Sequence, residues 1–569
     1  MKKISSRTLK LNGFICSFLL QLLIINTGKS QVSLLKDINT GTSASNPNPI
    51  ITVGSTTVLT AYNPNYGTEL WATNGTTATT ALLKDFTTGS ISSTFSSSFI
   101  NYNGLLYFGA SDFTNGQELW QSDGTTAGTV LVKNINPGTA SSSPNNFVLF
   151  NNLIYFFATT LSHGAELWKT DGTAANTVEV KNIAAGSASS SPANLKVFNN
   201  KLYFSATDNV NGIELWQSDG TTNGTTMLKN INASGSSTPE VFNLFNNALY
   251  FRADNGVNGV ELWKTNGTAA GTVLVADIFS TGSSTPRGFA AINSTALVFF
   301  ANDGTHGTEL WKTDGSTAGT VIVKDIISGI NSGYGSFQMI FNNKLFFNYN
   351  DGITGNELWS TDGTSTGTTL LKDINPGSPI ANPFLLSVVN DLLYFGANDG
   401  VHGTELFRTD GTTSGTVMVQ DINPGSASSD PSYFFQEGNN LYLSATIAAT
   451  GTELFKMSAP LMLHLKVYFE GLYEAGNTLR PVLYNQSIST NPSVCDSVTI
   501  CLQNSTSPFS IAYIIPSLID VYGNVNVIIP PEAYNGTYYL CVKHRNSLET
   551  WSKIPVTFGG VTANNLTGN

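Results

Sequence analysis

The sequence predicts an all-β protein whose main part is a β-propeller, and three observations predict it. A unit around Gly-x-Glu-Leu-Trp recurs nine times at steps of 47 to 49 residues. Each copy holds four short apolar runs, and the two ends of the repeat region supply complementary strands. A period this regular indicates one supersecondary unit copied around or along an axis. The glutamates of the copies are Glu69, Glu118, Glu166, Glu214, Glu261, Glu309, Glu357, Glu405 and Glu453.

One copy, residues 146–183, shows how the unit is built. Its apolar runs are FVLF, LIYFFA, AELWKT and TVEVKNI, which we name strands A to D. Asn151 and Asn152 separate A from B, and Asp171 with Gly172 separates C from D. Asn and Asp tolerate left-handed backbone angles and Gly has no Cβ, so these residues predict hairpin turns. A longer loop, AAGSASSSP, leads to the next copy. Four strands and one longer link describe a propeller blade.

The ends of the repeat region favour a closed ring over an open solenoid. The region begins with Val32–Ile38, which has the pattern of a D strand alone, and ends with A, B and C strands that lack a D. A propeller closes when its N-terminal strand completes the last blade, whereas a solenoid needs polar capping repeats. We therefore predict a nine-bladed propeller of about 48 residues per blade over residues 31–458. An eight-bladed ring with one displaced unit is the alternative.

The composition excludes some classes of partner. Charged residues make up only 11% of the 569 residues, and the formal net charge is −11. Nucleic-acid binding needs a basic face, which this balance argues against. The same balance gives no support to electrostatic membrane binding.

Residues 1–30 have the pattern of a secretory signal peptide. Basic residues precede an apolar run at Phe14–Ile25, and small polar residues follow it up to Ser30. The apolar run is too short for a confident membrane span. We expect a secreted or cell-surface protein that is monomeric and has no membrane span once the signal is removed.

A second pattern spans strands B and C of the copies. It reads Ala-x-Asp-x-x-x-Gly-x-x-x-Trp, as at Ala206, Asp208, Gly212 and Trp216. This is similar to the tryptophan-docking motif of quinoprotein propellers. The resemblance implies that the indole packs flat on the neighbouring blade, with the Ala leaving room for it. The expected docking residues are Trp71, Trp120, Trp168, Trp216, Trp263, Trp311, Trp359, Phe407 and Phe455.

The whole unit, ELWxTDGTxxGTxLVKDI, resembles the ELWxxDGT repeats of exported bacterial proteins. The resemblance covers about residues 32–457 and recurs in nine copies. It implies a propeller-type surface or secreted protein.

The period stops after Phe455, and residues 459–569 predict a β-sandwich with a polar tail. Alternating apolar residues begin at Leu463 and further strand-like runs follow. The stretches CDSVTICL and GTYYLCVKHRNSLETWS resemble a β-domain found near the C-termini of type IX-secreted proteins. An exported chain with Cys495, Cys501 and Cys541 allows one disulfide. A bridge between Cys501 and Cys541 is one option, which the sequence alone does not assign.

Candidate ligand residues have structural interpretations that we favour. The nine glutamates recur identically, whereas active sites combine unlike roles. His163, His306 and His402 occupy one turn slot in separate copies, which predicts a turn role rather than a shared metal ion. Calcium takes about six to eight oxygen ligands, and loops such as residues 302–307 offer only one Asp each. We predict no catalytic residue, metal site or cofactor. Calcium is the one ion that we retain as an alternative.

These observations predict a non-catalytic binding or scaffold protein that presents propeller loops to polysaccharide or protein ligands. The alternative is an enzyme, either a propeller acting on extracellular polysaccharide or a quinone-type oxidoreductase. Such an enzyme needs side chains of different chemical types at one site. The residues that depart from the repeat are therefore its candidate functional residues. They are Glu179, Glu240, Arg252, Arg287, Tyr334, Tyr349 and Arg408.

Overall fold

The computed structural model contains β-strands and no α-helix among the residues it describes. These residues are 32–330, 332–333, 335, 338–377, 379–438, 440–458, 460–467, 473–474, 478–479, 494–530, 533, 536–544, 550–552 and 555–558. The predicted signal peptide lies outside them. Contacts divide the chain into one compact unit at Gln31–Leu463 and another that holds His464–Asn569. Within the described residues, nothing helical has the length and apolar character needed to cross a bilayer.

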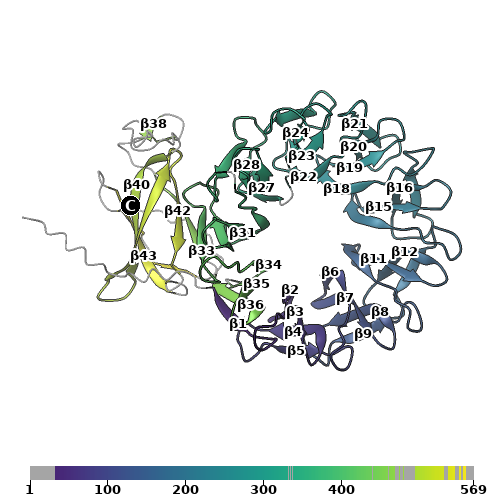
Figure 1. The fold of residues 1–569 in the computed structure, drawn as a ribbon, viewed down its shortest axis with the longest axis horizontal. Helices are drawn as coiled ribbons and strands as arrows, with labels where there is room; N and C mark the ends of the chain where they lie inside the picture. The colour runs from purple at the N-terminus through teal and green to yellow at the C-terminus, as the bar shows by residue number, and fades with distance from the viewer. Residues whose placement is uncertain are drawn as a thin grey trace, which may run out of the picture. The chain divides into compact units, whose positions relative to one another are not determined.

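The unit at Gln31–Leu463 is built from nine separate four-stranded antiparallel sheets in its described residues. Figure 1 shows them arranged around a common centre, with the A strands innermost. The A strands are β2 (Asn48–Val53), β6 (Phe95–Tyr102), β10 (Asn145–Phe150), β14 (Ala193–Phe198), β18 (Glu240–Phe245), β22 (Arg287–Ala291), β26 (Gln338–Phe341), β30 (Phe384–Val389) and β34 (Ser432–Glu437). The B strands are β3 (Thr56–Asn63), β7 (Leu105–Asp112), β11 (Leu153–Thr160), β15 (Lys201–Thr207), β19 (Ala248–Asp254), β23 (Leu297–Asn302), β27 (Lys344–Asn350), β31 (Leu392–Asn398) and β35 (Asn440–Ile447).

Strands C and D complete each sheet on its outer side. The C strands, which carry the Glu-Leu-Trp unit, are β4 (Gly67–Thr73), β8 (Gly116–Ser122), β12 (Gly164–Thr170), β16 (Ile213–Ser218), β20 (Val260–Thr265), β24 (Thr308–Thr313), β28 (Asn356–Thr361), β32 (Thr404–Thr409) and β36 (Gly451–Ser458). The D strands are β1 (Ser33–Lys36), β5 (Ala81–Lys84), β9 (Val130–Lys133), β13 (Val178–Lys181), β17 (Thr226–Lys229), β21 (Val273–Ala276), β25 (Val321–Lys324), β29 (Thr369–Lys372) and β33 (Val417–Gln420). The repeated, propeller-like all-β architecture predicted from the period is therefore confirmed.

The N-terminal strand belongs to the sheet formed by the end of the repeat region. Strand β1 pairs antiparallel with β36, with Ser33 opposite Lys456 and Leu34 opposite Phe455. The order of that sheet is β1-β36-β35-β34. The D-like sequence at Val32–Ile38 thus supplies the strand that the last copy lacks.

Neighbouring sheets are linked by the same side-chain contacts in successive copies. The Thr222 hydroxyl donates to the carbonyl oxygen of Val180 in the preceding sheet at 2.7 Å. The equivalent Thr77 hydroxyl donates to the carbonyl of Leu35 in β1, also at 2.7 Å. The first and last sheets are therefore joined by the same threonine hydrogen bond that joins sheets adjacent in sequence.

The core lies between the sheets rather than inside them. Trp216 and Ala206 of one sheet share an apolar cluster with Phe157, Leu167 and Val180 of the preceding sheet. A sheet one strand thick has no interior, so its apolar faces must be covered by neighbours. A large ring opposite a small Ala fills that space, and an aromatic buries about 150–250 Å². All nine predicted docking residues are buried except Trp311, which is partly buried against its cluster. Flat docking of each indole stays a prediction.

The C-terminal unit is also all-β. Its described residues include a seven-stranded sheet of β37 (Leu461–Lys466), β42 (Asn524–Ile529), β41 (Ile511–Asp520), β40 (Val494–Asn504), β43 (Thr537–Lys543), β44 (Thr550–Trp551) and β45 (Val556–Thr557). A two-stranded ladder of β38 (Tyr473–Glu474) and β39 (Thr478–Leu479) lies apart from that sheet in hydrogen bonding. The two-layered sandwich stays a prediction, because the described strands form one large sheet and this ladder.

We expect Cys501 and Cys541 to form a disulfide under oxidising conditions. They are direct partners in the antiparallel register of β40 and β43, and both are buried. Adjacent strands bring directly opposite residues to about 4.5–5.5 Å between Cα atoms, which a disulfide can span. Peptide mapping by mass spectrometry without reductant should recover the linked pair. The variant Cys495→Ser should keep the bridge. Recovery of a linkage through Cys495 from the unsubstituted chain would show that the pairing is wrong.

Candidate binding face

The B–C and D–A connections leave the same end of each sheet, because strand direction alternates in an antiparallel sheet. We call the surface made by these connections the loop face. Its B–C loops are residues 64–66, 113–115, 161–163, 208–212, 255–259, 303–307, 351–355, 399–403 and 448–450. Its D–A loops are the described residues of 37–47, 85–94, 134–144, 182–192, 230–239, 277–286, 325–337, 373–383 and 421–431.

Loops of neighbouring sheets contact one another across the loop face. The backbone N–H of Leu161 donates to the Asn136 side chain of the preceding sheet at 3.1 Å. Within one sheet, Gly212 has a φ of +78°, and a Cβ placed there would lie 2.2 Å from the carbonyl oxygen of Gly235. The glycine of the docking motif is therefore needed where the D–A loop crosses strand C.

Large apolar side chains stand at the tips of seven B–C loops. Their exposed fractions run from 37% at Tyr66 to 87% at Val257. Turns normally carry Gly, Pro, Asn, Asp or Ser at such positions. Where such groups join into a contiguous exposed patch, they mark an interaction surface. The tip residues are Tyr66, Phe113, Leu161, Val210, Val257, Ile353 and Val401, and Ile91, Ile330 and Ile380 are exposed on the D–A loops.

A side chain two residues upstream holds the backbone N–H of four of the seven tips, Val210, Val257, Ile353 and Val401. The N–H groups of Val401 and His402 donate to Asp399 Oδ1 at 2.9 and 2.8 Å. The N–H of Val210 donates to Asp208 Oδ1 at 2.9 Å in the same way. An Asp side chain that binds the amide two residues on is an Asx turn, which fixes a tight loop. The Asp of the docking motif thus presents the apolar tip.

The three loop histidines act within their own sheets. Nδ1 of His306 lies 2.7 Å from Asp303, and Nδ1 of His402 lies 2.7 Å from Asp399. The hydrogen bond and charge of Asp303 raise the pKa of His306. His163 contacts Glu179 at 2.9 Å. Among the described residues, no three His, Cys, Asp or Glu side chains are grouped as metal ligands would be.

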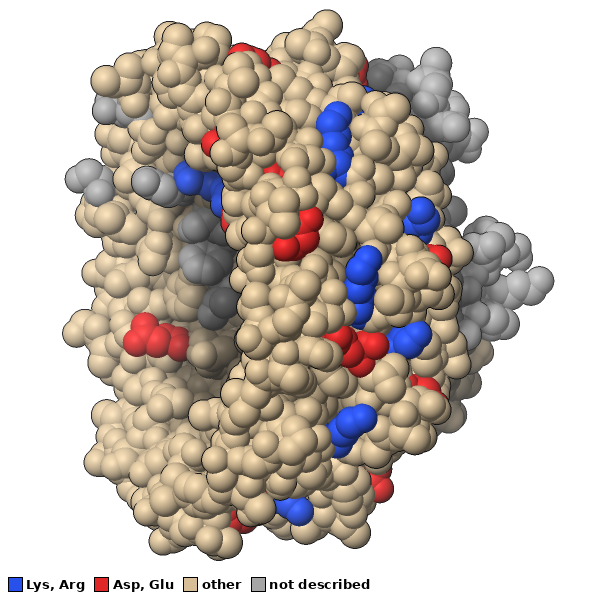
Figure 2. Space-filling view, turned by 90° about the vertical axis from the view of Figure 1, so that its right-hand side faces the viewer, with Lys and Arg blue, Asp and Glu red and all other residues tan. Residues whose placement is uncertain are grey.

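The loop face has a one-sided charge. Its loop residues include eleven Asp and no Lys or Arg. Polyanions need cationic partners, so this surface does not suit nucleic acid or acidic polysaccharide. Elsewhere, charged side chains are scattered singly among uncharged residues on the side of the molecule shown in Figure 2.

The nine repeated glutamates clamp the bases of the D–A loops. Glu214 accepts hydrogen bonds from the N–H of Ile231 at 2.6 Å and from the N–H and hydroxyl of Ser237 at 3.0 and 2.6 Å. All nine carboxyls are fully buried. Burial raises their pKa values against the effect of these donors, to about 7 for Glu166, Glu309 and Glu357. The geometry is that of a structural clamp, as the sequence predicted.

Four of the departures that the structure describes, Glu179, Glu240, Arg252 and Tyr349, make local contacts. Glu240 and Arg252 are directly opposite on β18 and β19, and the Arg252 Nε donates to the Glu240 carboxylate at 3.1 Å. The Tyr349 hydroxyl donates to the carbonyl of Thr308 in the preceding sheet at 3.0 Å. Tyr334 lies outside the described residues. Sequence reasoning noted these departures but missed the apolar loop tips. Only Val210, Val257 and Val401 directly precede Asn-Gly or His-Gly, so the sequence offered a partial signal.

Comparison with known proteins identifies no family. The chain matches no family model and no curated protein. The computationally designed Ika8 protein is 13% identical and matches over 75% of this chain and 99% of its own, with a TM-score of 0.36. A puromycin-hydrolyzing peptidase of Mycobacterium tuberculosis is 12% identical over 74% of this chain and 58% of its own, with a TM-score of 0.35. Saccharomyces cerevisiae Sqt1 is 12% identical over 62% of this chain and 93% of its own, with a TM-score of 0.32.

Proposed function

We propose that this is an exported, non-catalytic binding or scaffold protein whose loop face docks an extracellular protein partner. One observation carries the proposal, namely the exposed apolar tips that recur in seven copies, four of which are held by Asx turns. Exposed apolar side chains cost solubility unless they are covered, and a protein surface covers them well. Neutral polysaccharide is the second ligand class that these Ser-, Thr- and Asn-rich loops suit.

We also propose that the nine sheets are blades of a closed nine-bladed propeller. The β1–β36 pairing and the Thr77–Leu35 contact support closure, because the same contact joins Thr222 to Val180 between sheets adjacent in sequence. Strand β2 also packs against β34 of the last sheet. Nine sheets of one topology favour nine blades over an eight-bladed ring with a displaced unit.

The non-catalytic part of the proposal rests on what the charged residues do. The repeated glutamates share one clamping role, and Glu240, Arg252, Glu179 and His163 pair locally. A reaction centre combines unlike groups around one substrate position. The alternative of a propeller enzyme that acts on polysaccharide rests on fold-level analogy, and that of a quinone-type oxidoreductase rests on the docking-motif resemblance.

Replacing apolar tips should weaken docking. Residues 31–569 would be immobilised and exposed to extracellular proteins of the source cells and, separately, to neutral polysaccharides, while retention and product release are recorded. A triple Val→Thr variant at Val210, Val257 and Val401 should weaken retention of the protein partner about tenfold or more. Thr is tolerated at this slot, because Thr305 occupies it in one copy.

The matched control places the same three Val→Thr changes outside the loop face. Val130, Val178 and Val321 begin D strands and are comparably apolar and partly exposed. The control should retain the partner as the parent chain does. Equal loss in both variants would mean that the tips have no special role, retention of polysaccharide alone would move the proposal to that class, and product release would overturn the non-catalytic reading.

A further inference from the structure

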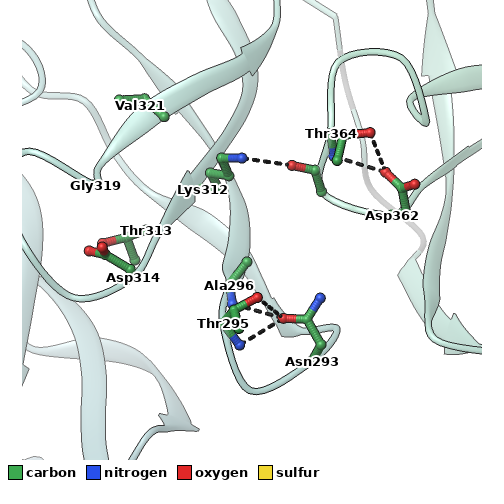
Figure 3. Close-up of a pocket in the computed structure, with 11 residues that line it drawn as sticks. Asn293, Thr295, Ala296, Lys312, Thr313, Asp314, Gly319, Val321, Asp362 and Thr364 are labelled. Atoms are coloured by element: carbon green, nitrogen blue, oxygen red, sulfur yellow. Dashed lines mark hydrogen bonds between the residues drawn. The ribbon is translucent and has the colours of Figure 1, made fainter.

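One interface between sheets contains a cleft of about 370 Å³. It lies between the sheet of β22–β25 and the sheet of β26–β29, and Figure 3 shows polar side chains around it. A volume near 300 Å³ or above is typical of small-molecule sites. Its polar lining includes Asn293, Thr295, Lys312, Asp314, Asp362 and Thr364.

The cleft lies beside one of the three copies that lack a tyrosine at a slot of strand B. The other six copies carry Tyr there, and in five of them the hydroxyl lies against a glycine of the next sheet. At one such interface, a Cβ placed on Gly220 would lie 2.1 Å from the Tyr155 hydroxyl oxygen. At the cleft the slot is Val298, and its nearest carbon lies 3.8 Å from a Cβ placed on Gly363. The shorter side chain leaves space that a phenol ring fills elsewhere.

A longer turn borders the same space. Strands β10 and β11 are joined by a two-residue turn between the paired Phe150 and Leu153, whereas Ala291 pairs with Leu297 across five residues. Within the longer turn, Asn293 Oδ1 accepts hydrogen bonds from the N–H and hydroxyl of Thr295 at 2.8 and 2.7 Å. The turn thus places an amide and a hydroxyl at the edge of the cleft (Figure 3).

The charges in the cleft select among ligands. Hydrogen bonds from Ser316 hold the pKa of Asp314 below its usual range. Burial raises the pKa of Asp362, but hydrogen bonds from Thr364 outweigh it and the net pKa is lowered. Both carboxylates are therefore ionised at neutral pH. The ammonium of Lys312 also lines the cleft and donates to the Gly363 carbonyl at 3.1 Å. The charges of Lys264 and Lys344 act on Asp314 and Asp362, respectively.

We infer that this cleft binds a neutral polyhydroxylated ligand, such as a sugar unit. The lining carries both carboxylates and an ammonium, so neither an anion nor a cation meets a surface of purely opposite charge, and an apolar ligand would shut these polar groups off from water. Hydroxyl groups can donate to the carboxylates and accept from the ammonium, the amide and the threonine hydroxyls. The inference is independent of protein docking at the loop face.

Filling the cleft should remove sugar binding. Residues 31–569 would be titrated by calorimetry and ligand-observed NMR with glucose, N-acetylglucosamine, maltotriose and cellobiose, and with glucuronic acid and calcium chloride as comparators. Neutral sugars should bind, and Val298→Tyr should weaken that binding at least about tenfold. The matched control Phe346→Tyr restores the same consensus tyrosine at the next interface and should leave affinity within about twofold.

The tyrosine of Val298→Tyr could clash with Ile292, which occupies part of the space beside Gly363. A second variant that does not enlarge a side chain therefore tests the same inference. Asp314→Asn should also weaken binding, whereas Asp219→Asn, at the same slot of another sheet, should not. Circular dichroism would confirm the fold of each variant. The inference is overturned if neutral sugars do not bind, if Val298→Tyr and Asp314→Asn bind as the parent does, or if glucuronic acid or calcium binds better than the neutral sugars.

Discussion

Replacing Trp216 with Ala should lower the free energy of unfolding by about 3–5 kcal/mol, the usual cost of deleting a buried large aromatic. Trp216 is 5% exposed and packs between its own sheet and the preceding one, in the cluster that holds Phe157 and Ala206. A single sheet has no core of its own, so deleting the indole would leave a cavity in the interface between two sheets. Urea denaturation followed by circular dichroism measures the change.

Trp216→Phe is the matched control for that prediction. The indole Nε1–H of Trp216 is buried and has no hydrogen-bond partner among the described residues, so a ring that lacks it forfeits only packing. The repeat itself carries Phe407 and Phe455 at this slot. We expect the Phe variant to lose less than half of what the Ala variant loses. An Ala variant within about 1 kcal/mol of the parent would show that the ring does not hold the interface.

Raising the pH from 5.5 to 8.5 should destabilise the protein. The buried glutamates have raised pKa values, with Glu166, Glu309 and Glu357 near 7. Between the unfolded value near 4.5 and the folded value, the folded state therefore binds more protons than the unfolded state. The stabilising contribution of these protonated glutamates is therefore present in full below about pH 4.5 and is lost as the pH rises through about 7. A shift from 4.5 to about 7 corresponds to at most about 3 kcal/mol for each group.

The urea midpoint at pH 5.5, 7.0 and 8.5 tests this expectation. Glu309→Gln removes one titrating carboxyl and should make the fall with pH shallower. The raised pKa of His306 acts in the same direction, because its charged form is favoured in the folded state. The variant His306→Asn, which carries the residue of other copies, separates that contribution. A midpoint that stays level or rises with pH would show that burial does not govern these carboxyls.

Much of the fold was predictable from local patterns. The order of four strands per copy follows from short apolar runs and turn residues, and the D-like character of Val32–Ile38 predicted its place beside the last C strand. The Asp of the docking motif indicated a turn, and the Asx geometry at Asp399 agrees with that. These features depend on residues within one repeat, or on copies that repeat the same signal many times.

The candidate sites were less accessible to sequence reasoning. The exposed fractions of Val210 and Val257 depend on how loops of neighbouring sheets meet, which no local pattern encodes. The cleft depends on Val298, on the longer turn at Ile292–Ala296 and on a loop of the next sheet at once. Each of these features alone is indistinguishable from neutral sequence variation. The tertiary structure shows that they border the same space.

The sequence by itself determined the repeat, the strand order, the turn chemistry and the absence of cations from the loop segments, because each is written within about 48 residues and copied. The tertiary structure decided which glutamate oxygens meet which amides, which apolar residues remain exposed, and where one interface fails to fill. Those outcomes depend on distances between sheets of about 10 Å, where one side chain more or less separates a packed contact from a cavity.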